Sequence, residues 1–458
     1  MDLLIKNGTI VTAETTFKAD IAVENGKIAL IGSSLDVPAE KVVDADGLLV
    51  LPGALDVHTH LQMAFGGTVS SDSYLSGTRA AACGGVTTVF DYAMQRKGHG
   101  LIETVKTRQE LCDPNACVDY AFHCIITDLN EGETLLDEFQ AAADYGVTSF
   151  KCFFVYKKEG MMVDDATFIK VLLKAKEVGC MTNLHAENPD VIDMNIANFL
   201  KEGKTSAWYH YLSRPEFVEA EADKRAVHWC KSVDAPLYIV HMADKEGLEA
   251  AVAAKREGAP VHIETCPQYL EFTCDVYKRE DGRNFVCSPP MKGQESQDAL
   301  WKAVADGSID TVATDHCPFM SYEKEWGKDN FTKIPNGCAG IENLYPYMLS
   351  AANEGKISYE RAVQLCATNP AKIFGCRDKG SLTVGKDADI VLYDPKKTFT
   401  ISVKNMHSDY DHTIWEGKTV KGYPVQTYVR GTLVYKDGEF VGTPGFGRYV
   451  KRIPAKTK

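Results

Sequence analysis

The stretch PGALDVHTHL (residues 52–61) decides the fold, because an apolar run ends here in two histidines one residue apart. Near-continuous apolar runs bounded by turn residues are typical of strands buried in a parallel sheet. Residues two apart in a strand point to the same side, so His58 and His60 would face one point. The stretch therefore predicts a buried strand that ends in a pair of imidazoles.

Seven further apolar runs follow in the middle of the chain. Amphipathic segments typical of helices separate them, among them 134–146, 166–179 and 248–258. Eight parallel strands that alternate with helices form a (β/α)8 barrel, which takes about 250 residues or more. We therefore expect an α/β protein built on a TIM-like barrel. Its eight strands are predicted at about residues 54–60, 86–93, 118–127, 148–155, 180–186, 236–242, 260–266 and 310–316.

Short strands with turn signals occupy both ends of the chain. Asn-Gly pairs at 7–8 and 25–26 are typical of β-hairpins. The segment YPVQTYVRGTLVYKDG (423–438) has the same pattern of short strands separated by turn residues. We expect residues 1–52 and 379–435 to form one small, discontinuous β-sandwich domain beside a catalytic barrel of residues 53–378. The Gly- and Lys-rich segment 436–458 is predicted to be a C-terminal arm that covers the surface or a neighbouring subunit.

The composition excludes several classes of protein. Of the 458 residues, 45% are hydrophobic and 25% are charged, which are ordinary globular values and exclude fibrous and disordered chains. The 50 Lys and Arg residues against 63 Asp and Glu residues give a net charge of −13, whereas a binder of nucleic acid or anionic membrane needs a basic face. We therefore expect no nucleic-acid partner and no membrane partner.

The cysteines and the apolar segments predict where the protein resides. The 14 cysteines include no CxxC pair and no metal-finger spacing, which is typical of reduced cytoplasmic thiols. No apolar run reaches the roughly 18 residues of a membrane span. The first residues, MDLLIKNGTIV, alternate like a strand and lack the apolar core of a signal peptide. We expect a cytoplasmic protein.

Ionisable side chains occur at five of the predicted strand ends, where barrel enzymes place their chemistry. A lone histidine at a strand end is more often a hydrogen-bonded core residue than a metal ligand, and His123 and His316 are interpreted in that way. Four histidines and one aspartate, each closing a strand of the same barrel, favour a metal site. Besides His58 and His60, the strand ends carry Lys151, His185, His241 and Asp315.

Lys151 lies inside the apolar run SFKCFFVY (149–156). A buried ammonium among such side chains costs roughly several kcal/mol unless it is paired or neutralised. Addition of CO2 to the neutral amine would give an anionic carbamate, whose two oxygens could bridge two divalent ions as a carboxylate does. The alternative is a lysine whose ammonium reaches the rim of the barrel. The residues alone leave both interpretations open.

The chain resembles the cyclic amidohydrolases of the dihydropyrimidinase and D-hydantoinase family over nearly its whole length. The motifs occur in family order, from PGALDVHTHL and GTRAAACGGVTTVFDY through GVTSFKCFFVYK, LHAEN and CSPPMK to ATDHCPF, IPNGCAGIE and KGSLTVGKDADIVLYDP. The resemblance implies a (β/α)8 barrel beside a β-sandwich, assembled as a homotetramer. It also implies two divalent metal ions per chain, usually zinc, bridged by a carbamylated lysine (N6-carboxylysine). The implied metal ligands are His58, His60 and Asp315 for the more buried ion, His185 and His241 for the other, and carbamylated Lys151 between them.

Five further residues match positions that contact the substrate in the family. The hydroxyl of Tyr156 would bind the substrate carbonyl, and the backbone of Ser288 and Asn336 would grip the ring amide. The loop around Met63 and Phe65 would line the pocket for the exocyclic substituent. These roles come from the resemblance, since the same residues alone would be interpreted as ordinary loop positions.

Two loops depart from the family pattern. HLQMAFGG places Gln62 and Ala64 where relatives often have Asp and Pro. PNGCAGIEN places Cys338, Ala339 and Asn343 where Gly, Pro and Asp are expected. The metal ligands are unchanged, so we expect catalysis to be retained and the substrate preference to be the property affected.

The implied reaction opens a cyclic diamide with water. A 5,6-dihydropyrimidine would give an N-carbamoyl-β-amino acid, and a hydantoin an N-carbamoyl-α-amino acid, through a hydroxide that bridges the two metal ions. Asp315 would take the proton of the water and deliver it to the leaving nitrogen. Tyr156, together with one metal ion, would stabilise the oxyanion.

Two alternatives remain at this point. Allantoinase or dihydroorotase is the nearer one. Dihydroorotase must bind a substrate carboxylate, which favours an arginine near the pocket. The segments around Phe65, Tyr156 and Asn336 contain none, although Arg96 follows the second predicted strand. A non-catalytic scaffold of the same fold is the other alternative, and the intact ligand set argues against it.

Overall fold

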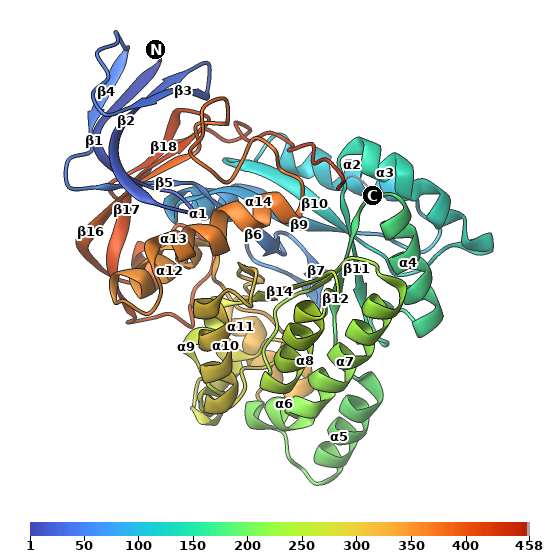
Figure 1. Cartoon of the computed structure of the whole chain (residues 1–458). Helices are drawn as coiled ribbons and strands as arrows, with labels where there is room; N and C mark the ends of the chain where they lie inside the picture. The colour runs from blue at the N-terminus through green and yellow to red at the C-terminus, as the bar shows by residue number, and fades with distance from the viewer. Residues whose placement is uncertain (456–458) are drawn as a thin grey trace.

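The eight strands predicted in the middle of the chain form one parallel barrel in the computed structural model, which describes residues 1–455 (Figure 1). The barrel closes where Thr59, at the end of the first strand, pairs with His316, just beyond the last. The amide of His60 donates a hydrogen bond of 2.8 Å to the carbonyl of His316 at the same seam. The barrel strands are β6 (Ala54–Thr59), β9 (Val86–Met94), β10 (Asp119–Ile125), β11 (Ser149–Phe153), β12 (Met181–His185), β13 (Leu237–Ile239), β14 (Val261–Thr265) and β15 (Thr311–Val312).

Helices surround the barrel (Figure 1). Their apolar side chains are buried in one core with those of the barrel strands. In α4 the carboxylate of Asp164 caps the first turn by accepting from the amide of Thr167, and Phe168 and Leu172 are buried. The helices are α1 (Tyr74–Cys83), α2 (Leu101–Cys112), α3 (Phe139–Tyr145), α4 (Asp165–Glu177), α5 (Pro189–Lys201), α6 (Ala207–Ser213), α7 (Glu216–Val233), α8 (Lys245–Arg256), α9 (Pro267–Glu271), α10 (Gln294–Asp306), α11 (Ser321–Lys324), α12 (Leu344–Asn353), α13 (Tyr359–Val363) and α14 (Asn369–Ile373).

Two of the three predicted helices match, and the third does not. The segments 166–179 and 248–258 correspond to α4 and α8. The segment 134–146 is helical but is not one α-helix: its first residues end the 3-10 helix η1 (Glu131–Glu138), and the short α3 follows. Gly132 and Glu133, just before the segment, adopt left-handed backbone angles, so no regular helix extends through them.

Strands from both ends of the chain form one mostly antiparallel sheet beside the barrel (Figure 1). Its N-terminal and C-terminal parts meet where β5 pairs antiparallel with β16, with Val50 opposite Leu392. Both side chains belong to a separate hydrophobic core between the two halves. The fold class expected from the sequence, a (β/α)8 barrel with a smaller domain built from the terminal segments, is therefore confirmed. The strands of this sheet are β1 (Leu3–Val11), β2 (Thr16–Glu24), β3 (Lys27–Gly32), β4 (Lys41–Asp44), β5 (Leu49–Pro52), β16 (Ile390–Thr400), β17 (Thr419–Val429), β18 (Thr432–Lys436) and β19 (Glu439–Phe440).

The C-terminal segment runs across the amino ends of the barrel strands. The amide of Val450 donates to the carbonyl of Tyr120 at 2.7 Å, and the amide of Ala455 donates to Gly179 just before β12 at 2.9 Å. Arg452 is buried, and its guanidinium donates to the Ser149 hydroxyl at 2.8 Å and to the Phe122 carbonyl. The predicted arm 436–458 thus begins within the terminal sheet, in β18 and β19, and only from about residue 447 to residue 455 does it pack against the chain's own barrel; its last three residues lie outside the described part.

Among residues 1–455 no helix combines the length and the apolar character that a membrane span requires.

Candidate functional site

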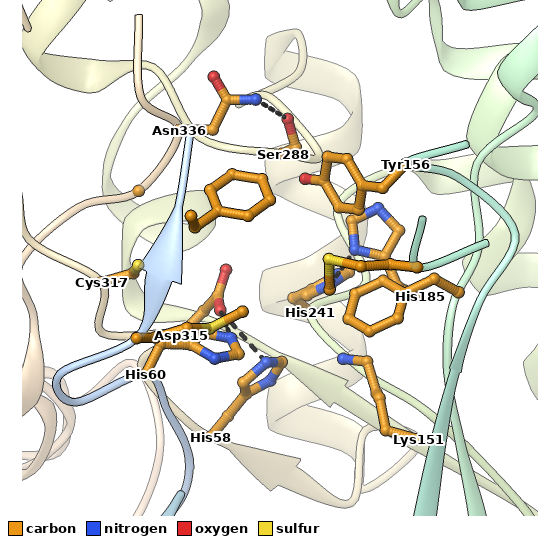
Figure 2. A pocket seen from close by; sticks show the side chains of 15 residues that line it. His58, His60, Lys151, Tyr156, His185, His241, Ser288, Asp315, Cys317 and Asn336 are labelled. Carbon is orange, nitrogen blue, oxygen red and sulfur yellow. Dashed lines mark hydrogen bonds and ion pairs between the residues drawn. The ribbon is translucent and has the colours of Figure 1, made fainter. Parts of the chain in front are cut away.

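The six predicted ligand side chains meet at the carboxyl ends of the barrel strands and line one cavity (Figure 2). His58 lies in β6, Lys151 in β11 and His185 at the end of β12. His241 and Asp315 lie in the segments that follow β13 and β15. The barrel therefore brings together residues that are up to about 260 positions apart, because parallel strands end at the same edge.

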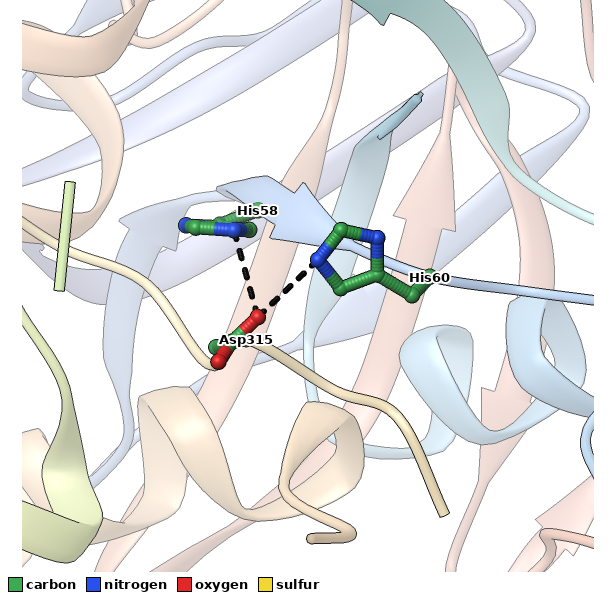
Figure 3. Close-up of side chains that lie close together, drawn as sticks. All are labelled: His58, His60 and Asp315. Atoms are coloured by element: carbon green, nitrogen blue, oxygen red, sulfur yellow. Dashed lines mark ion pairs between the residues drawn. The ribbon is translucent and has the colours of Figure 1, made fainter. Parts of the chain in front are cut away.

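His58, His60 and Asp315 form the tightest group (Figure 3). Asp315 Oδ1 lies 3.2 Å from His58 Nε2 and 3.0 Å from His60 Nε2. His58 is fully buried, and its Nε2 has no hydrogen-bond partner among residues 1–455. Burial alone would raise the pKa of Asp315, but the two imidazoles hold it at about 2. An anionic oxygen and two imidazole nitrogens that converge in this way fit a divalent metal ion.

His185 and His241 form a second group beside the first. His185 Nδ1 and His241 Nε2 lie only 2.9 Å apart, so these two nitrogens face each other and share one position for a proton or a cation. The other nitrogen of His185 lies 2.7 Å from Glu187 Oε2, which also accepts from Arg214 at 2.8 Å. Burial lowers the pKa of both histidines, well below the usual range for His241, so both are neutral imidazoles suited to bind a metal ion.

Lys151 lies below both groups and is 1% exposed. Its Nζ lies 4.9 Å from the ring centroid of Tyr92 and 5.0 Å from that of Phe153, and none of the hydrogen bonds or ion pairs within residues 1–455 involves it. Burial lowers the pKa of its amine to about 8. The alternative in which the lysine reaches the rim therefore does not describe this side chain, whose amine faces the cavity (Figure 2).

A buried glutamate on β14 connects the two groups of histidines. Glu264 Oε1 lies 2.7 Å from His58 Nδ1 and accepts from the backbone amide of His241 at 2.9 Å. Its Oε2 accepts from the hydroxyl of Tyr238 at 2.8 Å. A carboxylate in this position fixes the tautomer of His58, so that Nε2 presents its lone pair to the cavity.

Several residues of the site have strained backbones. Tyr156, His241 and Asp315 adopt positive φ angles of 67°, 39° and 51°, a region that residues other than glycine rarely occupy. Such strain is stored at functional sites when the surrounding structure imposes it. It aims the three side chains into the cavity from segments that would otherwise continue as strands or loops.

The predicted substrate residues line the outer part of the same cavity (Figure 2). The Tyr156 ring packs edge-on against Phe65 and His185, and burial raises the pKa of its hydroxyl, which stays protonated as a donor. Asn336 Nδ2 donates to Ser288 Oγ at 2.9 Å and so joins the two loops that were predicted to grip the ring. A larger cavity adjoins across Phe65, Tyr156 and Asn336.

The residues that depart from the family pattern lie outside the cavity lining. Gln62 and Ala64 are exposed, whereas Met63 and Phe65 between and beside them line the cavity. Cys338 and Ala339 are buried behind Gly337. Any effect of these residues on the substrate is therefore indirect, through the loops that carry the lining residues.

His123 and His316 remain outside the cavity lining. His123 lies between Ser149 Oγ and the Val57 carbonyl, at 2.5 and 2.9 Å. His316 Nε2 lies 2.8 Å from Asp72 Oδ2. Both imidazoles are satisfied core residues, as the sequence predicted.

Glu264, Glu187 and Arg214 were missed by the reasoning from the sequence. Glu264 had a usable signal, because it stands near the end of the seventh predicted strand in VHIETC (261–266). Glu187 stands two residues after His185 in LHAEN. Arg214 gave no signal, since a single arginine in a helical region is ordinarily a surface residue.

Nearly the whole chain is similar to known proteins in sequence and in structure. A family model described as "Amidohydrolase family" matches residues 49–434. A D-hydantoinase of Ralstonia pickettii is 42% identical and one of Rhizobium radiobacter 41% identical, each aligned over 99% of both chains. The crystal structure of a dihydropyrimidinase from Brevibacillus agri superposes with a TM-score of 0.97 at 41% identity, covering 99% of both chains.

Proposed function

This chain belongs to the amidohydrolase family, in the group that contains the D-hydantoinases and dihydropyrimidinases, and we propose that it opens 5,6-dihydropyrimidines or 5-substituted hydantoins to N-carbamoyl amino acids. It is a metal-dependent hydrolase that acts on cyclic amides. The observation that carries the proposal is the convergence of four histidines, Asp315 and the buried amine of Lys151 on one cavity at the barrel mouth.

The metal centre in this proposal holds two divalent ions, most simply zinc. His58, His60 and Asp315 would hold one ion, and His185 and His241 the other, because each group presents nitrogens or oxygens that converge. Lys151 would bridge them as a carbamate, which replaces a buried unpaired amine by an anion between two cations. Neutral imidazoles and anionic oxygens are ligands that zinc prefers. Such ions supply a water acidic enough to attack an amide near neutral pH.

The chain's own residues would divide the remaining work. Asp315, held as a carboxylate at the cavity, would take the proton of the attacking water and return it to the leaving ring nitrogen. The protonated Tyr156 hydroxyl would donate to the substrate carbonyl as negative charge develops on its oxygen. Ser288 and Asn336, joined by their side-chain hydrogen bond, would hold the ring amide with their backbone groups. Met63 and Phe65 would contact the exocyclic substituent.

A ring that carries a carboxylate fits this cavity less well. Among the described residues no arginine lines the inner cavity. Arg214 lines the adjoining one, where Glu187 already neutralises it. Arg96, which followed the second predicted strand, lines a different cavity behind Met63. Dihydroorotate is therefore the weaker candidate substrate.

The remaining expectations from the sequence are part of the same proposal. We propose a barrel of residues 53–378 as the catalytic domain, a second domain of residues 1–52 and 379–435, and residues 436–458 as the arm; the residues assigned to the site all lie in the first. Each of the 14 cysteines is a free thiol, which supports a cytoplasmic location. The homotetramer rests on the resemblance to the family.

Parallel ring-opening assays test the proposal. The purified, zinc-loaded chain should turn over dihydrouracil, a 5-substituted hydantoin or both, and should be at least about tenfold less active on dihydroorotate and allantoin. A chelator should abolish turnover and added zinc should restore it. Loss of activity in His58→Ala, with activity retained in the exposed-residue control His228→Ala, would support the site. Turnover that survives chelation, or a clear preference for dihydroorotate, would contradict it.

A further inference from the structure

Three buried carboxylates form a second cluster outside the barrel mouth. Glu219 and Asp223 lie one turn apart on α7 and so point to the same side of that helix, and Asp244 immediately precedes α8. Oxygen atoms of the three side chains lie within 4.8 Å of one another. None of the three residues is more than 2% exposed, so water does not solvate their charges.

Two of the three carboxylates have clear structural partners. Asp244 Oδ1 accepts from the amide of Gly247 at 2.8 Å and caps α8. Glu219 Oε1 accepts from the amide of Ala243 at 2.8 Å, and its Oε2 lies 3.2 Å from the ammonium of Lys292. These contacts account for the burial of both side chains.

Asp223 has no such partner. Both of its carboxylate oxygens are buried and lack a hydrogen bond to any residue in the range 1–455. A buried carboxylate without a donor is among the most costly groups that a protein can contain. Burial and the two neighbouring carboxylates raise the pKa of Asp223 well above its usual range, so this side chain is neutralised either by a proton or by a cation that the polypeptide itself does not supply.

The open oxygens of Asp223 and Asp244 converge on one point beside α8. A methyl group on Gly247 would collide with Oδ2 of both side chains. Both oxygens therefore lie against the Cα of Gly247, a position where only glycine leaves room for them. Two anionic oxygens that lie this close to one position are arranged as ligands of a cation.

The charge of the cluster indicates what kind of cation would fit. Lys292 is 3% exposed, and its ammonium lies 3.2 Å from Glu219 Oε2; within residues 1–455 no other ion pair reaches the three carboxylates. Two negative charges therefore remain when all three are ionised. All the donors are hard oxygens, unlike the imidazoles of the barrel mouth, and hard oxygens select magnesium, calcium or manganese ions.

We propose that Glu219, Asp223 and Asp244 bind one hard divalent cation that ties α7 to α8. The site is separate from the barrel mouth and does not depend on the reaction there. It is nevertheless connected to it, because Lys292 also donates to the carbonyl of Arg214 at 3.2 Å, and Arg214 holds Glu187 against His185. A cation here would fix the helices behind one of the predicted metal ligands.

Calorimetric titration of the zinc-loaded chain with magnesium, calcium and manganese chloride in turn tests the proposal. One of these ions should bind at one equivalent per chain and raise the melting temperature. Asp223→Asn and Asp244→Asn each remove one charge at constant shape, and Asn still caps a helix, so both should weaken binding by about tenfold or more. Gly247→Ala keeps every charge and should weaken binding, because the new methyl group would push Oδ2 of Asp223 and Oδ2 of Asp244 out of position.

The control is Asp234→Asn, at the exposed end of the same helix, where the side chain is 81% exposed. It should bind the cation as the unmodified chain does. The proposal is wrong if none of the three ions binds at millimolar concentration, or if binding is unchanged in Asp223→Asn and Asp244→Asn. A higher melting temperature of Asp223→Asn in the absence of any cation, together with no binding to the unmodified chain, would show that protons neutralise the cluster instead.

Discussion

Two buried basic side chains, one at each end of the barrel, differ in whether the polypeptide supplies their hydrogen-bond partners. At the amino end Arg452 donates to the hydroxyl of Ser149 and to the carbonyl of Phe122. At the carboxyl end Lys151, two residues further along the same strand as Ser149, has no hydrogen-bond or ion-pair partner for its amine among residues 1–455, and the rings of Tyr92 and Phe153 lie about 5 Å from it. The arginine is satisfied by the polypeptide, and the lysine is not.

This difference indicates a structural role for Arg452 and a functional role for Lys151 within one barrel. A buried polar group that the chain satisfies contributes to a unique fold, whereas one left unsatisfied costs stability and persists where a ligand completes it. The base of a barrel of this kind ordinarily serves stability and the mouth serves catalysis. The comparison therefore predicts that substitutions at the two ends will affect different measurements.

Substitution of Lys151 should have the largest effect on activity. Lys151→Met removes the bridging ligand, and a loss of several kcal/mol of transition-state stabilisation corresponds to about 10³-fold or more in kcat/KM. The metal content should fall below two ions per chain in elemental analysis. If Lys151→Met kept both metal ions and full activity, Lys151 would not be a metal ligand, and its unpaired amine would have no catalytic role.

The same variant should gain stability when no metal is present. The lowering of the lysine pKa from 10.5 to about 8 costs roughly 3 kcal/mol at neutral pH. This cost is fully present below pH 8 and disappears as the pH rises to the unfolded value. Denaturant unfolding of the metal-free chain at pH 7 should therefore show Lys151→Met to be the more stable form, with the difference vanishing near pH 10.5.

Glu264→Gln should have the next largest effect, since it weakens the support of the ligands without removing one. Glutamine is nearly isosteric but cannot accept from His58, Tyr238 and the His241 amide together. Metal affinity should fall about 10–100-fold, measured by competition with a chelator. Glu271→Gln, a partly exposed glutamate on α9, is the matched control and should leave affinity unchanged.

The rate at which the carbamate forms should depend on pH, and this change should be smaller than that in metal affinity caused by Glu264→Gln. Only the neutral amine adds CO2, and its fraction rises about tenfold between pH 7 and 9 when the pKa is about 8. Reactivation of the metal-free enzyme with zinc at a fixed concentration of dissolved CO2 should accelerate accordingly. A rate independent of pH over this range would speak against an amine with this pKa.

Arg452→Met should leave activity almost unchanged and reduce stability. The substitution removes the arginine donor from the Phe122 carbonyl and from the Ser149 hydroxyl, which keeps its contact with His123, at a cost of roughly 1–3 kcal/mol. The unfolding midpoint should fall while kcat/KM stays within about twofold. Lys451→Met, at the exposed neighbouring residue, provides the control. A large loss of kcat/KM in Arg452→Met but not in Lys451→Met would contradict a purely structural role for Arg452.

The barrel and its mouth could be predicted from the sequence because their signals are local. Apolar runs identify the strands, and a pair such as His58 and His60 reveals its shared direction through alternation alone. Contacts between distant segments gave no such signal. Glu264 meets His58 across 206 positions, and Arg452 stands in a basic tail that composition alone assigns to the surface.

The acidic cluster was missed for a different reason. Asp223 lies in EAEADKR (219–225), a sequence typical of a solvated helix face, and only the packing of α7 against α8 buries it. The 3-10 geometry at the start of the predicted helix 134–146 likewise follows left-handed backbone angles at Gly132 and Glu133, just before it, that the amphipathic pattern does not encode. The burial of a charged residue and a left-handed backbone both depend on tertiary packing, so local sequence patterns predict them poorly.

The central claim is that Lys151 is satisfied by CO2 and two metal ions, as Arg452 is satisfied by the polypeptide. The most direct test is to reconstitute the metal-free chain with zinc and 13C-labelled bicarbonate and to count the label by carbon NMR. We expect one 13C carbamate and two zinc ions per chain in the active enzyme, and no label in Lys151→Met. Full activity with two zinc ions but without incorporated label would contradict the account.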